Sequence, residues 1–454
     1  MSTARTADVV VAGGGFAGAS VAAALGESGY EVLVVEPGLD RTKRLAGELI
    51  HPPGATDLAT LGLRDRLRRG SVVPVHGFAV LPEGDADAYV LRYGEIPGLE
   101  PHGFAIDHAD LTAGLADALA RLPHVTVWSG ARVTGVDLHH PDFAAVIISR
   151  DGRNALLRAR LLVGADGASS PTRASAGIGH ERVRISHMVG YLLRDVRLPH
   201  PGFASVFVGG PAPTLAYAIG DSTVRLMFDV PPNPYGIAAP SRDGAYCRAL
   251  PEPFRSQVSA ALASQRALVS VNYSIQPHAV GLGRFALVGD AAGCCHPLTA
   301  TGLTASTRDA IHLRQALRET GNVPVAVQRY ATLREGPQRT RVALAESLYR
   351  AFSEQTPEMR LLRDGILRFW KRSRRGRAAS LALLSTHEGR MSMMALCYAH
   401  AMGHAMIELG RRRGTAEHRT SVTARGRAAL RLCRATLGVF RSLWFPRVTR
   451  RIPA

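Results

Sequence analysis

ADVVVAGGGFAGASVAAALGESGYEVLVVE, residues 7–36, is the stretch that decides the fold of this 454-residue chain. An apolar β-branched run, an alanine-rich helical segment and a second apolar run follow one another, and Gly13 to Gly18 fit the pattern G-x-G-x-x-G. In a strand–helix–strand unit, these glycines allow a tight turn, close approach of the backbone to a pyrophosphate, and close packing of helix on strand. The pattern therefore predicts a dinucleotide site that contains Gly13, Gly15 and Gly18.

Glu36 ends the second apolar run, at the distance from the glycines where an acidic residue meets the ribose hydroxyls. A Gly-rich turn with a purely structural role is the alternative, because chains rich in alanine and glycine produce this spacing by chance. The strand before the glycines, the helix after them and the acid together favour dinucleotide binding.

The composition is that of a globular chain long enough for two or three domains and a sizeable core. Its five cysteines form no C-x-x-C pair and no regular spacing, which is typical of free thiols in a reducing compartment. The N-terminus enters the first apolar run without a basic-then-apolar leader. We therefore expect the protein to be cytoplasmic.

Positive charge is concentrated near the C-terminus. The net charge is +18, and residues 371–454 contain 18 Lys and Arg but only three Glu. This asymmetry indicates an anionic partner surface, either phospholipid headgroups or nucleic acid. Aromatic residues are not interleaved among these charges, so no nucleic-acid partner is expected.

Two C-terminal segments have the pattern of helices at an interface. Residues 391–407 contain no Lys, Arg, Asp or Glu but fall short of the roughly 20 residues that span a bilayer, which favours a buried or interfacial helix. Residues 425–445 place an arginine stripe beside an apolar stripe ending near Trp444 and Phe445, as in a helix among lipid headgroups. Packing on the protein's own core is the alternative. We expect peripheral binding to the inner face of the membrane through these helices.

Two further apolar runs end in polar turns. One leads into GADGASSPTR, residues 164–173, where Asp166 follows the strand and Ser, Thr and Arg open a helix; an ordinary capped turn is the alternative. The other leads through Gly289 into Asp290, followed by a long helical segment over 303–317. Three strand ends of this kind predict that one edge of the sheet binds a ligand. At this edge a carboxylate would bind the hydroxyl groups of a ribityl chain, and the backbone amides at a helix N-terminus would bind an electron-rich ring.

The middle of the chain has a different pattern. Residues 187–271 read as short alternating strands, with a hairpin around residues 220–222. Upstream, the pattern predicts a helix over 53–67 and a strand over 72–81.

His296 lies beside two cysteines, but no second His, Cys or carboxylate shares a ligand spacing with it. No metal site is predicted, and we expect His296 to have a structural role in its loop.

In its three glycine-containing turns the chain resembles the flavin monooxygenases of the aromatic-hydroxylase type, in which three such sequence fingerprints bind FAD. RLAGELIHPPGATDLATLGL, residues 44–63, is similar to the R-x-x-GE-x-x-QPGG…L-LGL stretch of squalene monooxygenases (squalene epoxidases). GDAAGCCHPLTATGLTAS, residues 289–306, is similar to their GDA-x-x-x-RHPLTGGGMT-x-A. The similarity covers most of the chain.

The resemblance implies FAD as cofactor and a roof over the substrate pocket formed by the sheet that starts at His187. Taken with the glycine pattern, it predicts FAD contacts from twelve residues. These residues are Gly13, Gly15, Phe16, Ala17, Gly18, Glu36, Arg44, Asp166, Asp290, Pro297, Gly302 and Leu303.

The predicted architecture is α/β, with a Rossmann-type FAD-binding domain interleaved with a mostly antiparallel substrate domain. The FAD-binding domain comprises residues 1–75, 104–180 and 276–340, and the substrate domain comprises 76–103 and 181–275. Residues 341–454 form a C-terminal helical, basic region that we expect to contact the membrane.

The chain departs from the family pattern at several positions. Ala300 and Thr301 replace two glycines, and Phe78 stands where the family often has tyrosine. The arginine expected near the start of the helix at residues 108–111 is absent. These changes leave FAD binding as the expectation and leave the identity of the substrate open.

The implied reaction is a monooxygenation in which reduced FAD adds O2 at C4a and a dry pocket protects the hydroperoxide while one oxygen passes to a double bond. No catalytic residue is assigned. The expected substrate is a lipophilic terpenoid or prenylated molecule. The alternatives are a hydroxylase of an aromatic or polyketide substrate, a flavin-dependent isoprenoid reductase, and a non-catalytic membrane-binding protein. Electrons would come from NAD(P)H directly or through a separate flavin reductase.

Overall fold

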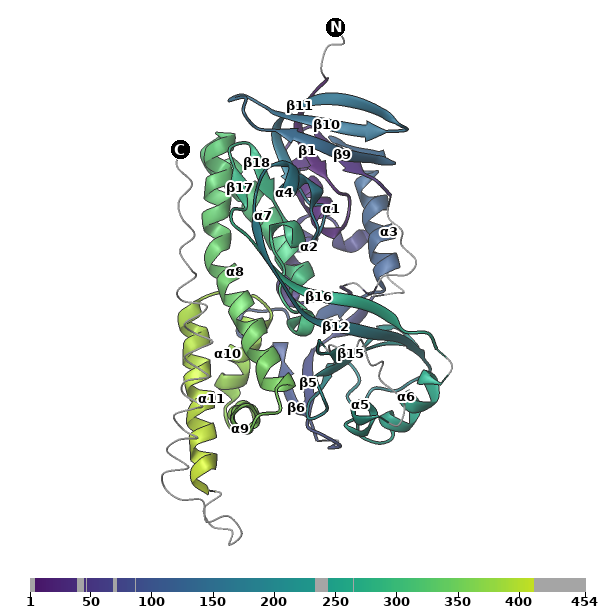
Figure 1. Cartoon of the computed structure of the whole chain (residues 1–454), viewed down its shortest axis with the longest axis vertical. Helices are drawn as coiled ribbons and strands as arrows, with labels where there is room; N and C mark the ends of the chain where they lie inside the picture. Colours follow the sequence, from purple (N-terminus) through teal and green to yellow (C-terminus); the bar gives the residue numbers. More distant parts are fainter. Residues whose placement is uncertain are drawn as a thin grey trace.

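The computed structural model describes residues 5–38, 45, 47–67, 72–85, 87–232, 244–263 and 265–411. Figure 1 shows three parts: one sheet at the top, a second sheet below it, and long helices along the left side. Two predicted features, Arg44 and the helix over 425–445, lie outside the described residues.

An eight-stranded sheet forms the upper part, in the order β17-β18-β11-β1-β2-β8, and β10 and β9 extend it from β11. The strands from β18 to β8 are parallel, as expected of apolar runs covered on both faces. The strands are β1 (Arg5–Ala12), β2 (Val32–Glu36), β8 (Val125–Ser129), β9 (Ala131–Asp137), β10 (Ala144–Arg150), β11 (Arg153–Gly164), β17 (Gly281–Leu282) and β18 (Phe285–Leu287).

The carboxyl ends of three parallel strands meet at one edge of this sheet. Ala12 at the end of β1 lies opposite Gly164 of β11, which in turn lies opposite Leu287 of β18. The turns that follow are the three that the sequence singles out. The predicted α/β fold with a parallel sheet is therefore confirmed.

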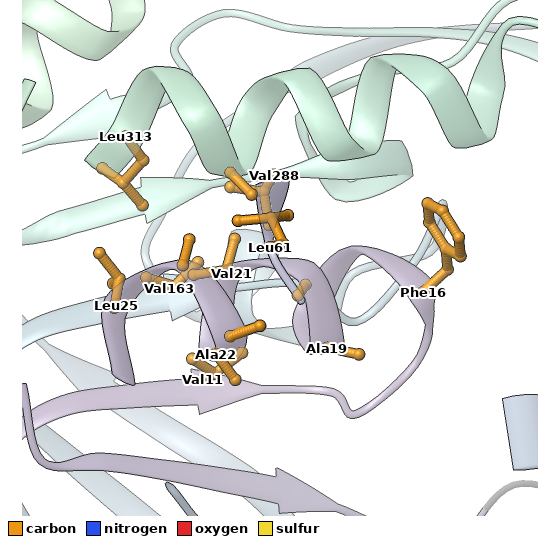
Figure 2. Packing of buried hydrophobic residues seen from close by; sticks show 14 of the residues in the cluster. Val11, Phe16, Ala19, Val21, Ala22, Leu25, Leu61, Val163, Val288 and Leu313 are labelled. Carbon is orange, nitrogen blue, oxygen red and sulfur yellow. The ribbon is translucent and has the colours of Figure 1, made fainter. Parts of the chain in front are cut away.

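Helix α1 (Phe16–Gly26) fastens this edge to helix α7 (Gly302–Thr320). Its small residues allow it to lie buried between the sheet and α7. Figure 2 shows Val21 of α1 in one apolar cluster with Val163 of β11 and Leu313 of α7. The first fingerprint is thus held in place by the core of the sheet.

The second sheet has seven strands in the order β16-β12-β15-β14-β13-β5-β6, and every neighbouring pair except β13 and β5 is antiparallel. The predicted hairpin is the pair β14–β15. The strands are β5 (Gly77–Leu81), β6 (Tyr89–Arg92), β12 (His180–Arg194), β13 (Ala204–Phe207), β14 (Thr214–Gly220), β15 (Thr223–Val230) and β16 (Leu268–Pro277).

The two faces of this sheet have different partners. Leu226 and Phe228 of β15 pack with the short helices α5 (Ala245–Arg248) and α6 (Phe254–Leu262). Because side chains alternate along a strand, Met227 packs on the opposite face, in the cluster shared with the long C-terminal helices. That inner face forms the roof over the candidate site.

Short elements connect the two sheets. A three-stranded sheet, in the order β3-β7-β4, contributes side chains to the cores of both, and several short helices pack around the sheets. These elements are β3 (Leu49–Ile50), β4 (Val73–Val75), β7 (Gly103–Ala105), α2 (Pro52–Thr60), α3 (His108–Leu119), α4 (Pro171–Ser175), and the 3-10 helices η1 (Arg64–Arg66), η2 (Tyr93–Glu95), η3 (Gly289–Ala292) and η4 (Pro297–Thr299).

Four helices follow α7 and pack beside both sheets (Figure 1). They are α8 (Val323–Ser353), α9 (Pro357–Arg372), α10 (Arg374–Leu384) and α11 (Met391–Arg411). Within the residues that the structure describes, none of the helices combines the length and apolarity needed to cross a membrane. The division into domains with the predicted boundaries stays a prediction.

Two predicted elements are wrong in extent. The helix over 53–67 ends at Thr60, because Gly62 has φ of +61° and turns the chain before the short η1. The strand over 72–81 is two strands in different sheets, β4 and β5. They separate at Gly77, where φ is +146° and a Cβ would overlap the carbonyl oxygen of Leu91.

Replacing Gly18 by Ala tests the packing of α1 on the first turn. A Cβ at Gly18 would overlap the carbonyl oxygen of Gly13. We expect Gly18→Ala to destabilise the protein by about 1–3 kcal/mol, the usual cost of overpacking, and to lower the midpoint of thermal unfolding. Gly15→Ala is the matched control, because nothing lies within 4 Å of a Cβ there. Equal midpoints for the two variants would contradict the packing described.

Candidate active site

The turn after β1 packs directly against the turn after β11. Gly13 has φ of +103°, and a Cβ there would lie 2.6 Å from the carbonyl oxygen of Ala165. Gly18 packs in turn on the carbonyl of Gly13. Gly15, between them, faces open space. Two glycines therefore close the turn, and the third leaves the backbone accessible to a ligand.

Glu36 supports the same turn from the end of β2. Its Oε2 accepts a hydrogen bond from the Gly14 N–H at 2.6 Å, and its Oε1 accepts one from the Gly38 N–H at 2.9 Å. The carboxylate thus holds the glycine loop. Its predicted contact with ribose stays a prediction.

Asp166 caps helix α4 in the second turn. Its carboxylate accepts hydrogen bonds from the Ser170 hydroxyl at 2.6 Å and from the Thr172 N–H at 2.8 Å. The buried Arg173 donates to the carbonyl oxygen of Ala291 at 2.8 Å and so ties the second turn to the third. In this structure Asp166 acts as a cap, and its contact with cofactor stays a prediction.

The third turn is held by a buried ion pair. The Gly289 N–H donates to Asp309 Oδ2 at 2.9 Å, and Arg334 donates to the other oxygen of Asp309 at 2.8 Å. Ala17 of α1 packs against Gly289, where a Cβ would lie 2.6 Å from the Cβ of Ala17. Asp290 is exposed beside these buried neighbours. The first and third fingerprints are therefore in contact, as predicted for residues at one site.

His296 anchors the loop that enters α7. Its Nε2 lies 2.7 Å from Asp229 Oδ2, its ring stacks on Tyr349, and its Nδ1 accepts a hydrogen bond from the Leu298 N–H. Since Nδ1 accepts, the bonding assigns the proton to Nε2. Ser186 also donates to Asp229, at 2.7 Å, so these side chains do not form a nucleophilic triad. They join the loop to the roof.

The N-terminus of α7 opens to solvent at the same edge. Gly302 is exposed, with nothing within 4 Å of a Cβ, and Pro297 is exposed one turn earlier. Leu303 instead packs inward, 3.1 Å from the position of a Cβ on Gly47. This edge thus combines accessible backbone with an apolar contact.

The residues present suit FAD. Helices α1 and α7 both begin here, and no side chain caps either N-terminus. Helix N-termini attract phosphate groups and electron-rich rings, and Asp290 is an exposed carboxylate at the same edge. The open positions at Gly15 and Gly302 leave the backbone approachable. The individual FAD contacts stay predictions, and Arg44 lies outside the described residues. Within those residues, no group of three His, Cys, Asp or Glu is arranged to hold a metal ion.

Two small apolar pockets lie beyond this edge. The first lies between Phe78 and Val206 of the roof and Leu298 and Thr299 of η4. The second lies among α8, α9, α10 and α11. Three side chains line both pockets: Leu348, Trp370 and Leu384. The two pockets are therefore neighbours, with these side chains forming part of the wall of each.

A buried ion pair joins the roof to the segment before β3. Arg225 of β15 donates to both oxygens of Glu48, at 2.6 and 3.0 Å, and Tyr217 donates to the same carboxylate at 3.3 Å. Glu48 is fully buried. No local sequence pattern indicates this partner of Glu48, because Arg225 is 177 residues away.

His51 and Tyr93 form another buried contact beside the first pocket. The sequence patterns did not identify either residue as part of the site. His51 Nδ1 lies 2.7 Å from the Tyr93 hydroxyl, and Nε2 lies 2.9 Å from the carbonyl oxygen of Thr299. Burial lowers the pKa of His51 to about 4, although the bond to Thr299 opposes this. One signal was available: His51 occupies the place of the glutamine in the R-x-x-GE-x-x-QPGG pattern.

Comparison with known proteins gives one consistent family. A family model described as "SE: Squalene epoxidase" matches residues 158–415. "Squalene epoxidase erg1" of Aspergillus fumigatus is 29% identical over 383 residues, which cover 80% of this chain and 79% of the relative. "Squalene monooxygenase" of Mus musculus is 27% identical over 397 residues, which cover 84% of this chain and 68% of the relative.

The solved structures agree on the fold. The p-nitrophenol 4-monooxygenase PnpA from Pseudomonas putida superposes with a TM-score of 0.67 at 21% identity and covers 87% of this chain and 98% of its own. At that identity the similarity concerns the fold alone. It is a fold shared with flavoprotein monooxygenases.

The pKa of His51 predicts how stability changes with pH. The unfolded chain takes up a proton at His51 near pH 6.5, whereas the native chain does so only near pH 4. Stability should therefore fall as the pH drops from about 6.5 to about 4, by up to about 3 kcal/mol from this residue. We expect His51→Gln to lose less thermal stability than the parent over that interval. Parallel profiles of unfolding midpoint against pH would contradict the assignment.

Proposed function

The chain belongs to the squalene epoxidase family, and we propose that it transfers one oxygen atom of O2 to a carbon–carbon double bond of a lipophilic terpenoid or prenylated substrate. Membership makes the chain an FAD-dependent monooxygenase and implies a lipophilic substrate and O2. The observation that carries the proposed substrate class is the apolar pocket that begins at Leu298 and Thr299, next to the N-terminus of α7.

The lining of the two pockets favours a hydrocarbon over a charged aromatic substrate. Within the described residues, both are lined by aliphatic, aromatic and small polar side chains, without Lys, Arg, Asp or Glu. A phenolate or carboxylate would lose its hydration there without gaining an ionic partner. An apolar chain has no such cost.

FAD, when bound, supplies the oxygen activation. The uncapped N-termini of α1 and α7 would hold its phosphates and ring system, and Glu36 and Asp290 would bind hydroxyl groups. The pocket wall orients the double bond and excludes water, which is the contribution that this chemistry requires of the protein. We propose NAD(P)H as the source of electrons, either directly or through a separate reductase.

An aerobic assay of the FAD-loaded protein tests the substrate class. Squalene, farnesyl-bearing aromatics and simple phenols would be offered with NADPH, with and without a flavin reductase, and products would be read by mass. We expect a gain of one oxygen on a prenyl or terpenoid double bond. Oxygen gain on phenols alone would support an aromatic hydroxylase instead, and saturation of a double bond would support a reductase.

Val206→Trp tests whether the first pocket holds the substrate. The larger ring would fill the space between β13 and η4, so we expect kcat/KM for the lipophilic substrate to fall by about tenfold or more while FAD binding is retained. Val183→Trp is the control, because Val183 is 59% exposed on β12 and lines neither pocket. An unchanged kcat/KM in Val206→Trp would contradict this location.

We also propose that the helical layer contacts a membrane surface. Leu396 and Ile407 of α11, three helical turns apart, are each 52% exposed, and Met406 is 39% exposed. Met394 and Ala405 are buried against the neighbouring helices. A helix that has no charged side chain over residues 391–407 and leaves large apolar side chains exposed is suited to lie at an interface. Helix α11 is also one of the four helices that enclose the second pocket.

The double variant Leu396→Glu with Ile407→Glu tests this contact. We expect its binding to vesicles of phosphatidylcholine and phosphatidylglycerol to fall by about tenfold, because two large apolar side chains no longer enter the interface. Val325→Glu on α8 is the control, since Val325 is 54% exposed on a different helix. Sedimentation with vesicles gives the bound fraction. Equal binding of both variants would exclude this face of α11 as the contact.

A further inference from the structure

His51 contacts the junction between η4 and α7 on both sides. Its Nε2 lies 2.9 Å from the carbonyl oxygen of Thr299, and its backbone N–H donates to the Thr304 hydroxyl at 3.1 Å. His51 has no exposed surface, and Thr304 has none either. One residue thus holds the chain at the last residue of η4 and again in the first turn of α7.

The bonding of the His51 ring requires one tautomer. A carbonyl oxygen can only accept, so the proton lies on Nε2 and is donated to Thr299. Nδ1 of a neutral ring then accepts, and the Tyr93 hydroxyl donates to it at 2.7 Å. Burial keeps the ring neutral. Tyr93 therefore orients His51, and His51 orients the peptide of Thr299.

That peptide leads into a strained residue. Ala300 has φ of +51°, the left-handed region that residues with a Cβ adopt at a cost. Such a conformation persists only where its surroundings hold it. The bonds from His51 to Thr299 and Thr304 lie on either side of Ala300. The strain and the anchor coincide at the point where the apolar pocket meets the N-terminus of α7.

We propose that His51 and Tyr93 are positioning residues, which set the distance between the hydrocarbon in the first pocket and the flavin at α7 by holding the Thr299–Ala300 peptide. The proposal rests on the proposed function for its consequence in catalysis. Neither side chain is proposed to react. Loss of either hydrogen bond should let Ala300 relax and move Thr299, which lines the pocket.

Tyr93→Phe is the main test, because it removes one hydroxyl and keeps the ring that packs against Phe78. The probe is FAD added to the apoprotein. We expect an FAD dissociation constant within about threefold of the parent, together with an altered absorption and fluorescence spectrum of the bound flavin. In turnover, we expect product formed per NAD(P)H to fall roughly three- to tenfold, with hydrogen peroxide rising to match.

Two comparisons separate positioning from general stability. Thr340→Val also removes a buried hydroxyl that donates to a backbone carbonyl, that of Gly389 at 2.7 Å, and it should change unfolding but not the flavin spectrum or the product ratio. His51→Gln retains an amide donor for Thr299 and should be affected less than His51→Leu. Ala300→Gly removes the strain and should reduce the effect of His51→Leu in the double variant.

The outcomes are distinct. ¹⁵N NMR of the apoprotein should show His51 protonated at Nε2, and protonation at Nδ1 would overturn the proposal. Equal flavin spectra for the parent and Tyr93→Phe, or the same changes in Tyr93→Phe and Thr340→Val, would also overturn it. If no substrate is oxidised by any variant, the proposed function fails, whereas the NMR and flavin spectra still decide the placement of His51.

Discussion

Direct contact of backbone with backbone, between the turns after β1 and β11, is the constraint on which the rest of the structure depends. Gly13 lies against Ala165, and Gly18 lies against Gly13, at distances that no side chain would permit. The contact places the N-terminus of α1 beside the turn that holds Arg173, which binds the third turn. Three segments far apart in the chain therefore present their backbones at one edge, where a dinucleotide can bind helix ends.

Buried polar pairs determine how the antiparallel roof lies over that edge. A polar group that is buried without a partner destabilises the folded state, so buried polar pairs favour one arrangement of the two sheets. They are Asp229 with His296, Arg225 with Glu48, and Tyr93 with His51. The side chains between them are apolar and form the pocket walls. The polar contacts thus position the roof, and the apolar region is left for a substrate.

Local patterns were sufficient for much of the fold and for part of the candidate site. The parallel strands, α1, the β14–β15 hairpin and the order of the three turns follow from runs and glycine spacings within thirty residues. The extent of two elements did not follow. Residues 72–81 form a nearly continuous apolar run that looks like one strand, but Gly77 lets the chain leave one sheet for another because it fits against Leu91. For Asp166 the sequence left two interpretations open, a ligand contact and a cap of the following helix, and the structure shows the cap.

The sequence by itself determined the family, the parallel sheet and the residues available to meet a dinucleotide, because strand periodicity and the freedom of glycine act over a few residues. Only the tertiary structure decided which side chains share the pocket and what holds them. His51 and Thr299 are 248 residues apart, and Glu48 and Arg225 are 177 apart. Such pairs form because a buried polar group needs partners inside the protein, and no local pattern records which residues those partners are.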